Sequence, residues 1–200
     1  MRIESHRTAR LLAIAASAGL VLASVSACAG PHPSSSTRPG SRTGAQCPIG
    51  KWGVDIHDLE QQVVDALPET ADVVAHSSTG TQTWTFTADH VTVASDFTID
   101  VTEAIEGGHT EEVAQHHSGS VQMDWAIDGT DMTFSNYDAG DGAVTTTITV
   151  DGVGGQGQTI PLSGQSPYGL HLETVCRGAG MTLNTVGTEF TSHLSREGGS

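Results

Sequence analysis

Large apolar side chains alternate with polar ones over most of the chain beyond Val73, and this period of two restricts the fold more than any other feature. Successive side chains of a β-strand point to opposite faces of a sheet, so such alternation is typical of a strand with one buried face. Trp84 and Phe86 alternate with threonines, and residues 121–136 alternate on both sides of Asp128-Gly129, a dipeptide typical of hairpin turns. The chain is therefore predicted to be mainly β and antiparallel.

Two hairpins of this sheet have registers that the sequence predicts. Their loops are expected at Ala88-Asp89 and Asp128-Gly129, because a short turn between alternating segments fixes which residues face each other. Both choices place apolar side chains opposite apolar ones. The expected pairs are Phe86 with Val91, Trp84 with Val93, Trp125 with Met132, and Met123 with Phe134.

One helix is expected ahead of the strands, over residues 55–67. Asp55 or Asp58 can cap its start, and Pro68 ends it. Its buried stripe is expected to consist of Ile56, Leu59, Val63 and Leu67. Its exposed face is expected to hold His57, Glu60, Gln61 and Asp65.

Further strands are expected at five places, around Phe97 to Val101, Val144 to Val150, Leu170 to Cys176, Met181 to Thr185 and Phe190 to Ser195. The total is then about seven to nine antiparallel strands, which suits an antiparallel β-barrel or a strongly curled sheet. A β-sandwich is the alternative.

The first 27 residues are predicted to be a lipoprotein signal peptide. A short cationic start precedes a run of apolar and small residues that is too short to cross a bilayer comfortably. Val25-Ser26-Ala27-Cys28 resembles the lipobox of bacterial lipoproteins, in which the cysteine thiol receives a diacylglyceryl group and the chain is cut just before it. Further acylation, for example with palmitate, is common in that class. Two readings remain open: cleavage after Ala29, or an uncleaved membrane helix.

Residues 28–46 are predicted to be a lipidated N-terminus and a flexible linker, because they are rich in Pro, Ser, Thr and Gly and have no apolar pattern. Three cysteines occur in the chain. If Cys28 carries lipid, Cys47 and Cys176 remain to form a disulfide in an oxidising compartment. Residues 47–200 are then a single β domain, held at the extracytoplasmic face of the cell membrane.

The part of the chain after Cys28 is strongly acidic. It has five basic residues against 22 acidic ones, a formal charge of about −17. Such a charge argues against binding to nucleic acid and against electrostatic attachment to anionic lipid. We expect a membrane partner through the lipid anchor only.

From Cys47 onward the chain resembles a recurrent domain of uncharacterised actinobacterial lipoproteins. The similarity rests on Cys47-Pro48-Ile49-Gly50-Lys51-Trp52, on the strands of Trp84 and Trp125, and on residues 174–183, where Thr174 replaces a usual aromatic. Gly50-Lys51-Trp52 also resembles, distantly, the Gly-x-Trp of lipocalins, with Arg196 placed to pack over the tryptophan. These resemblances imply a role in the cell envelope and a barrel topology.

The chain shows no motif for catalysis, a cofactor or a metal. His109, His116 and His117, with Glu111 and Glu112, are the densest group of possible metal ligands, but adjacent strand residues point to opposite faces. Asp138 to Gly142 does not match a calcium loop. No nucleophile motif and no distinctive carboxylate pair is present. We therefore expect no enzyme activity, no cofactor and no metal.

The inward-facing aromatic and methionine side chains are the remaining candidates for function. They are expected to form either an ordinary core or an apolar cavity, and the residues concerned are Trp84, Phe86, Met123, Trp125, Met132 and Phe134. A cavity predicts binding of a lipid or another hydrophobic small molecule. The alternative is an envelope protein-interaction or structural module that has no ligand cavity.

Overall fold

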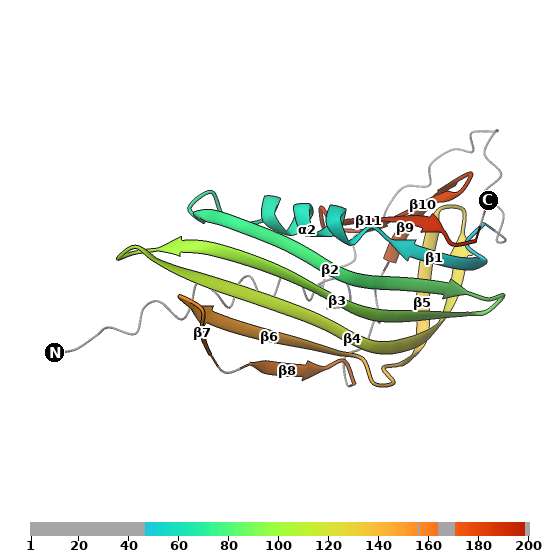
Figure 1. Ribbon diagram of the computed structural model, residues 1–200. Coiled ribbons are helices and arrows are strands. Elements are labelled where there is room, and N and C mark those ends of the chain that lie inside the picture. The colour runs from blue at the N-terminus through green and yellow to red at the C-terminus, as the bar shows by residue number, and fades with distance from the viewer. Residues whose placement is uncertain (1–46, 156, 164–170, 199–200) are drawn as a thin grey trace.

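A computed structural model describes residues 47–155, 157–163 and 171–198. These residues form one helix and one antiparallel sheet of eleven strands (Figure 1). The elements are β1 (Gly50–Val54), α2 (Ile56–Asp65), β2 (Val73–Phe86), β3 (His90–Ile105), β4 (His109–Asp128), β5 (Asp131–Asp138), β6 (Ala143–Val150), β7 (Val153–Gly154), β8 (Gln158–Pro161), β9 (His171–Arg177), β10 (Gly180–Thr185) and β11 (Thr191–Arg196). The prediction of a mainly β, antiparallel chain with one N-terminal helix is confirmed.

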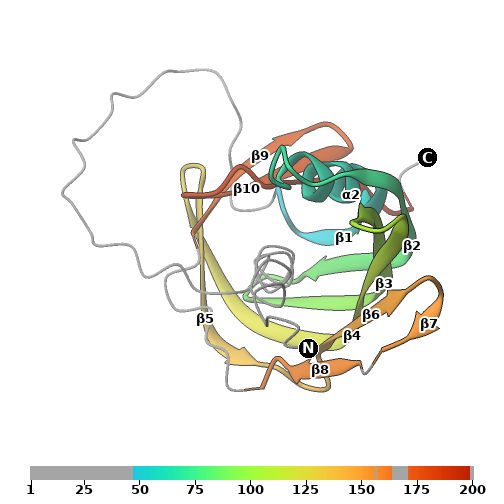
Figure 2. The same cartoon turned by 90° about the vertical axis from the view of Figure 1, so that its left-hand side faces the viewer.

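Eight of the strands close into a ring in the order β3-β2-β1-β11-β10-β9-β5-β4, and β3 also pairs with β4. Figure 2 views this ring end on, with β5 on one side and β2 and β3 on the other. β6 extends the sheet beyond the ring from β4, and β7 and β8 both pair with β6. The fold is thus a strongly curled single sheet rather than a sandwich of two sheets.

β4 has two different partners along its length, in addition to β3. Its first part, from Glu111 to Ser118, pairs with β6, and its last part, from Gln122 to Asp128, pairs with β5. Gly119 lies between the two parts and has a φ of 84°. The strand therefore leaves one neighbour and joins another at a glycine, which is the residue type that adopts this backbone conformation without strain.

Gly80 of β2 lies close to this level of the sheet, because it pairs with Phe97 of β3, two residues from Ser95, the partner of Gly119. Its φ is 93°, and a Cβ atom built on it would lie 2.1 Å from the carbonyl oxygen of Asp96 and 2.7 Å from the Cα of Phe97. No side chain fits in that space.

The first predicted hairpin is confirmed and the second is shifted. Trp84 pairs with Val93 and Phe86 with Val91, as expected. In the second hairpin the loop is Gly129-Thr130 instead of Asp128-Gly129, so the strands pair two residues away from the predicted register. The observed pairs are Trp125 with Phe134, Ile127 with Met132, and Asp128 with Asp131.

The turn itself explains this shift. Gly129 has a φ of 65° and Thr130 is not among the residues with positive φ, which is the pattern of a type II′ turn with glycine first. The prediction assumed a type I′ turn with glycine second. Because the register changes by two residues, each side chain stays on the face that was predicted for it.

Two of the predicted strands are parts of longer ones. Phe97 to Val101 continues the strand that begins at His90, and the predicted strand of Trp125 continues one that begins at His109 and includes the histidine-rich segment. Strands of 16 and 20 residues are longer than usual. Polar residues on both of them hide the continuity in the sequence.

The helix forms where it was expected, with Asp55 accepting a hydrogen bond from the backbone of Asp58 at its start. One assignment on it was wrong. Glu60 does not lie on the exposed face, since only 1% of its surface is accessible. It is four residues from Ile56 and three from Val63, so it belongs to the buried stripe.

Two apolar clusters fill the concave face of the sheet. The ring cluster lies inside the ring and the helix cluster lies between α2 and β3. On β3 the two meet along one face, because Val91 and Val93 belong to the first cluster and Phe97, Ile99 and Val101 to the second. We call this continuous concave surface the inner face.

The two ends of the described domain are joined beside Trp52. Cys47 and Cys176 form the predicted disulfide. The fully buried Trp52 donates its indole hydrogen to the carbonyl of Pro48 at 2.6 Å. The guanidinium of Arg196 lies 4.3 Å from the centre of the indole and donates to the carbonyls of Ile49 and Cys47. The packing of Arg196 over Trp52 is therefore confirmed, although Trp52 lies on a strand that leads directly into the helix.

Candidate functional site

The six residues predicted to line a cavity all lie in the ring cluster. They come from three strands, and each has 8% or less of its surface accessible. Trp84 stacks on Phe86 with 5.9 Å between the ring centres, and Trp125 meets Phe86 edge to face at 5.5 Å. Trp84 also meets Phe134 edge to face at 6.3 Å. The structure thus brings the six predicted side chains together on the inner face.

Both of the indole groups among these six are hydrogen-bonded. Trp125 donates to the carbonyl of Thr87 at 3.2 Å, and Trp84 donates to the side-chain oxygen of Gln82 at 3.4 Å. These bonds fix the orientation of both rings, since a buried indole N–H normally requires an acceptor.

Two hydroxyl groups on the inner face are buried without a partner among the described residues. Thr174 of β9 pairs with Leu183 and lies two residues from Leu172, both in the ring cluster. Its hydroxyl oxygen and that of Tyr137, which packs against the same cluster, have no hydrogen bond. Burial also raises the pKa of Tyr137. Unpaired buried polar atoms are uncommon and destabilising, so these two hydroxyls are unusual in an interior of this kind.

The inner face continues past the ring along the first half of β4. Val113, Gln115 and His117 point to it, since they alternate along the strand with Val121 and Met123. Gln115 has 3% of its surface accessible, and neither its amide nitrogen nor its oxygen has a partner in the described part of the chain.

His117, on the same part of the inner face, is a neutral histidine. Its ring stacks on Phe97 with 4.5 Å between centres and 8° between planes. Burial lowers the pKa of His117 to about 4, and the charge of His116 adds to the shift. The imidazole is therefore uncharged at neutral pH and acts as a flat aromatic surface.

This low pKa predicts a loss of stability in acid. An unfolded histidine has a pKa near 6.5, so the folded state favours the neutral form and gains stability that is fully present above pH 6.5. That contribution is lost as the pH drops from 6.5 through about 4, and the loss in the free energy of unfolding reaches about 3 kcal/mol. In urea unfolding, His117→Phe keeps the stacking and is expected to flatten the pH profile across this range. Parallel profiles for the two proteins contradict the assignment.

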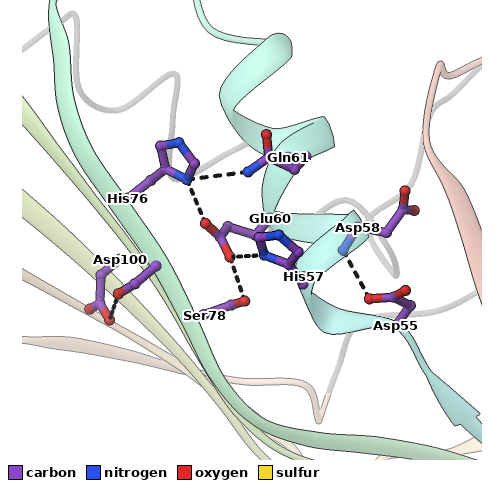
Figure 3. Close-up of polar contacts among 9 residues, drawn as sticks. Asp55, His57, Asp58, Glu60, Gln61, His76, Ser78 and Asp100 are labelled. Carbon is purple, nitrogen blue, oxygen red and sulfur yellow. Dashed lines mark hydrogen bonds and ion pairs between the residues drawn. The ribbon is translucent and has the colours of Figure 1, made fainter.

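A second polar cluster joins α2 to β2 around the carboxylate of Glu60 (Figure 3). Ser78 donates its hydroxyl to this carboxylate at 2.5 Å, His76 donates a ring N–H at 2.5 Å, and His57 donates one at 3.0 Å. A carboxylate only accepts hydrogen bonds, which sets both imidazoles as donors. All three partners converge on one buried side chain.

The charge on Glu60 is stabilised by these bonds. Burial raises the pKa of Glu60, but the hydrogen bonds from Ser78, His76 and His57 outweigh it and hold the pKa below its ordinary value. The hydrogen bond between Glu60 and His57 also raises the pKa of His57. Because the hydroxyl of Ser78 is bonded to a carboxylate and not to an imidazole, this arrangement differs from a nucleophile–base pair. The buried carboxylate thus links the helix to the sheet through hydrogen bonds.

The possible metal ligands on β4 have separate partners. His109 lies 2.5 Å from Asp151, His116 lies 3.1 Å from Asp96, and Glu112 accepts from Thr149. Within the described ranges, no group of three or more His, Cys, Asp or Glu is placed to hold a metal ion.

No family model, curated protein or solved structure matches this chain. Cys28, the predicted lipidation site, lies outside the described residues, as do residues 1–27. Over the part of the chain that the structure covers, no helix has the length and apolar character needed to span a membrane.

Three inner-face residues were not identified from the sequence as site candidates: Gln115, Tyr137 and Thr174. The signal for Gln115 was present, because it lies in step with Val121, Met123 and Trp125 along one strand. Tyr137 was hidden by a register shift between β4 and β5. Thr174 was noted only as a replacement for an aromatic residue.

Proposed function

We propose that this domain binds a hydrophobic small molecule or lipid on the inner face of the ring, while a lipid on Cys28 holds it at the extracytoplasmic face of the membrane. The observation that carries the proposal is the presence of unpaired hydroxyls, on Thr174 and Tyr137, within a mainly apolar interior. A core that serves packing alone pairs or avoids such groups. A ligand with an apolar body and a polar atom satisfies both requirements.

The aromatic and methionine composition of the interior supports the same function. Ligand sites are lined mainly by apolar and aromatic side chains with a few polar groups that fix orientation. Methionine adapts its shape to different occupants. Met123, Met132 and Met181, all fully buried, contribute three such side chains to the ring cluster.

Mass spectrometry of the full-length chain, purified from bacterial membranes, tests both parts of the proposal. Under denaturing conditions we expect a chain that begins at Cys28 and carries a covalent lipid. Under native conditions we expect an additional mass of several hundred daltons, which is lost on unfolding. A chain without covalent lipid contradicts the anchor.

The ligand-binding part of the proposal is contradicted by a separate result. If native and denatured masses agree, and added monoolein, methyl oleate and oleate leave the native mass unchanged, the domain does not bind such molecules. The envelope interaction module is then the better description. Thr174→Val serves as a matched variant, because it keeps the shape of the side chain and removes the unpaired hydroxyl.

A further inference from the structure

The inner face outside the ring has an ordered arrangement of polar and apolar rows. The register of β3, β4 and β6 defines these rows, because directly paired residues point to the same face. One row holds Glu103 and Glu111, and the row nearest the ring holds Phe97, His117 and Val144. Between them lie the row of Val101, Val113 and Ile148 and the row of Ile99, Gln115 and Thr146. We call these four rows the β4 track.

Gln115 is the central polar group of the track. Its amide has two donor hydrogens and one acceptor oxygen, and none of them has a partner among the described residues. Only 3% of the surface of Gln115 is accessible. Leaving a buried polar group unpaired costs roughly 1–3 kcal/mol. A ligand group that both accepts and donates, such as an ester next to a hydroxyl, matches this amide.

The outer end of the track carries acceptors. Glu103 and Glu111 pair across β3 and β4, and one carboxyl oxygen of Glu103 is buried without a partner in the described residues. Burial raises the pKa of both groups, and the charge of Glu103 adds to the shift of Glu111. These groups accept hydrogen bonds from hydroxyls and repel anions.

The described basic residues lie elsewhere. Lys51 forms an ion pair with Glu197, and Arg196 stacks on Trp52. Arg177 lies at the end of β9, which pairs with β5 and β10 and not with a strand of the track. The only imidazole on the track is that of His117, which is neutral at pH 7. An anionic head group therefore meets no positive partner on this face.

The remaining rows are apolar and lead in two directions. Toward the ring the face continues through Val121 and Met123 to the aromatic cluster. Away from β4 it reaches Ile160, Val150 and Val153, of which Val153 is 74% exposed. α2 covers the β3 side of the track at Phe97, Ile99 and Val101, and its cluster includes no residue of β4 or β6. The track thus presents an apolar path that joins the acceptor end to the ring interior.

We infer that the β4 track binds an uncharged acyl lipid with a hydroxyl-bearing head group, with its head at Glu103 and Glu111, its ester at Gln115 and its acyl chain in the ring. Gln115 and Glu111 are four residues apart, or roughly 13 Å along a strand, which leaves room for a glycerol or sugar head. This inference rests on the proposed function, because it assigns the class and orientation of the ligand that the ring holds.

Three oleoyl compounds separate the head-group chemistries: monoolein is uncharged with hydroxyls, methyl oleate is uncharged without them, and oleate is anionic. In native mass spectrometry of the full-length chain, we expect monoolein to bind at least tenfold more tightly than oleate, with methyl oleate in between. Gln115→Leu is expected to weaken monoolein binding about tenfold, through lost hydrogen bonds, and to leave methyl oleate less affected.

Gln122→Leu is the matched control, because Gln122 is an exposed residue of β4 that points to the other face. It is expected to bind all three compounds like the wild type. Replacing the Gln115 amide by leucine removes no hydrogen bond among the described residues, so Gln115→Leu is expected to fold, and its melting temperature checks this.

The outcomes separate the two proposals. If the wild-type chain binds none of the three compounds, the proposed function fails and this inference fails with it. If it binds oleate as tightly as monoolein, or if Gln115→Leu matches Gln122→Leu, ligand binding in the ring stands and the β4 track is not the head-group site. The wild-type preference alone decides the question if the variant does not fold.

Discussion

Replacing Gly80 with alanine is expected to destabilise the domain by about 3–5 kcal/mol. A positive φ costs a residue with a side chain on the order of 1–3 kcal/mol, and overpacking adds a comparable amount. Here the added carbon would meet backbone atoms of Asp96 and Phe97, at 2.1 and 2.7 Å, which cannot rotate away as a side chain can. Urea unfolding followed by tryptophan fluorescence measures the loss, since Trp84 lies in the ring cluster on the same strand.

Gly154→Ala is the control for this substitution. A Cβ at Gly154 has no atom within 4 Å, and its φ is not in the positive range. We expect its unfolding midpoint to stay within a few tenths of a kcal/mol of the wild type. Equal midpoints for Gly80→Ala and Gly154→Ala contradict the close approach of β2 and β3 at this level.

Removing the disulfide is expected to lower stability by about 4–5 kcal/mol. The cysteines are 129 residues apart, and in the chain-entropy model a cross-link over so long a loop strongly restricts the unfolded state. The double variant Cys47→Ser, Cys176→Ser is compared with the wild-type protein in urea.

The wild-type protein treated with a reducing agent should unfold at the same midpoint as the double variant, because both lack only the bond. If neither treatment changes the midpoint, the hydrogen bonds of Arg196 to Cys47 and Ile49 are sufficient to hold the N-terminal segment in place.

The sequence was most informative where alternation was strong and the turn was unambiguous. Trp84 and Phe86 paired as expected because Ala88-Asp89 left one short loop. The hairpin of Trp125 was shifted because Asp128-Gly129-Thr130 allows two turns, and the alternation is satisfied equally by registers two residues apart. Inner and outer faces were thus predictable, whereas exact partners were not.

The strand pairings that close the ring and the burial of polar groups on the inner face were not predictable. Pairings such as Val54 with Leu194 join residues far apart in the chain and leave no local pattern. Polar residues are usually solvent-accessible. The sequence therefore predicts an exposed position for Glu60 and indicates no role for Gln115. The buried position of Glu60 depends on three hydrogen-bond partners, which are Ser78, His76 and His57.

Pairing between the first and last strands also determines the order in which the chain can fold. The hairpins β2–β3 and β3–β4 join neighbouring segments and can form early, because little loop entropy opposes them. The ring needs β11, whose Ser195 pairs with Gly53 of β1, so it closes only after β11 has been synthesised. Until then the apolar inner face is exposed to water. A chain truncated before Thr191 is left as an open, aggregation-prone sheet.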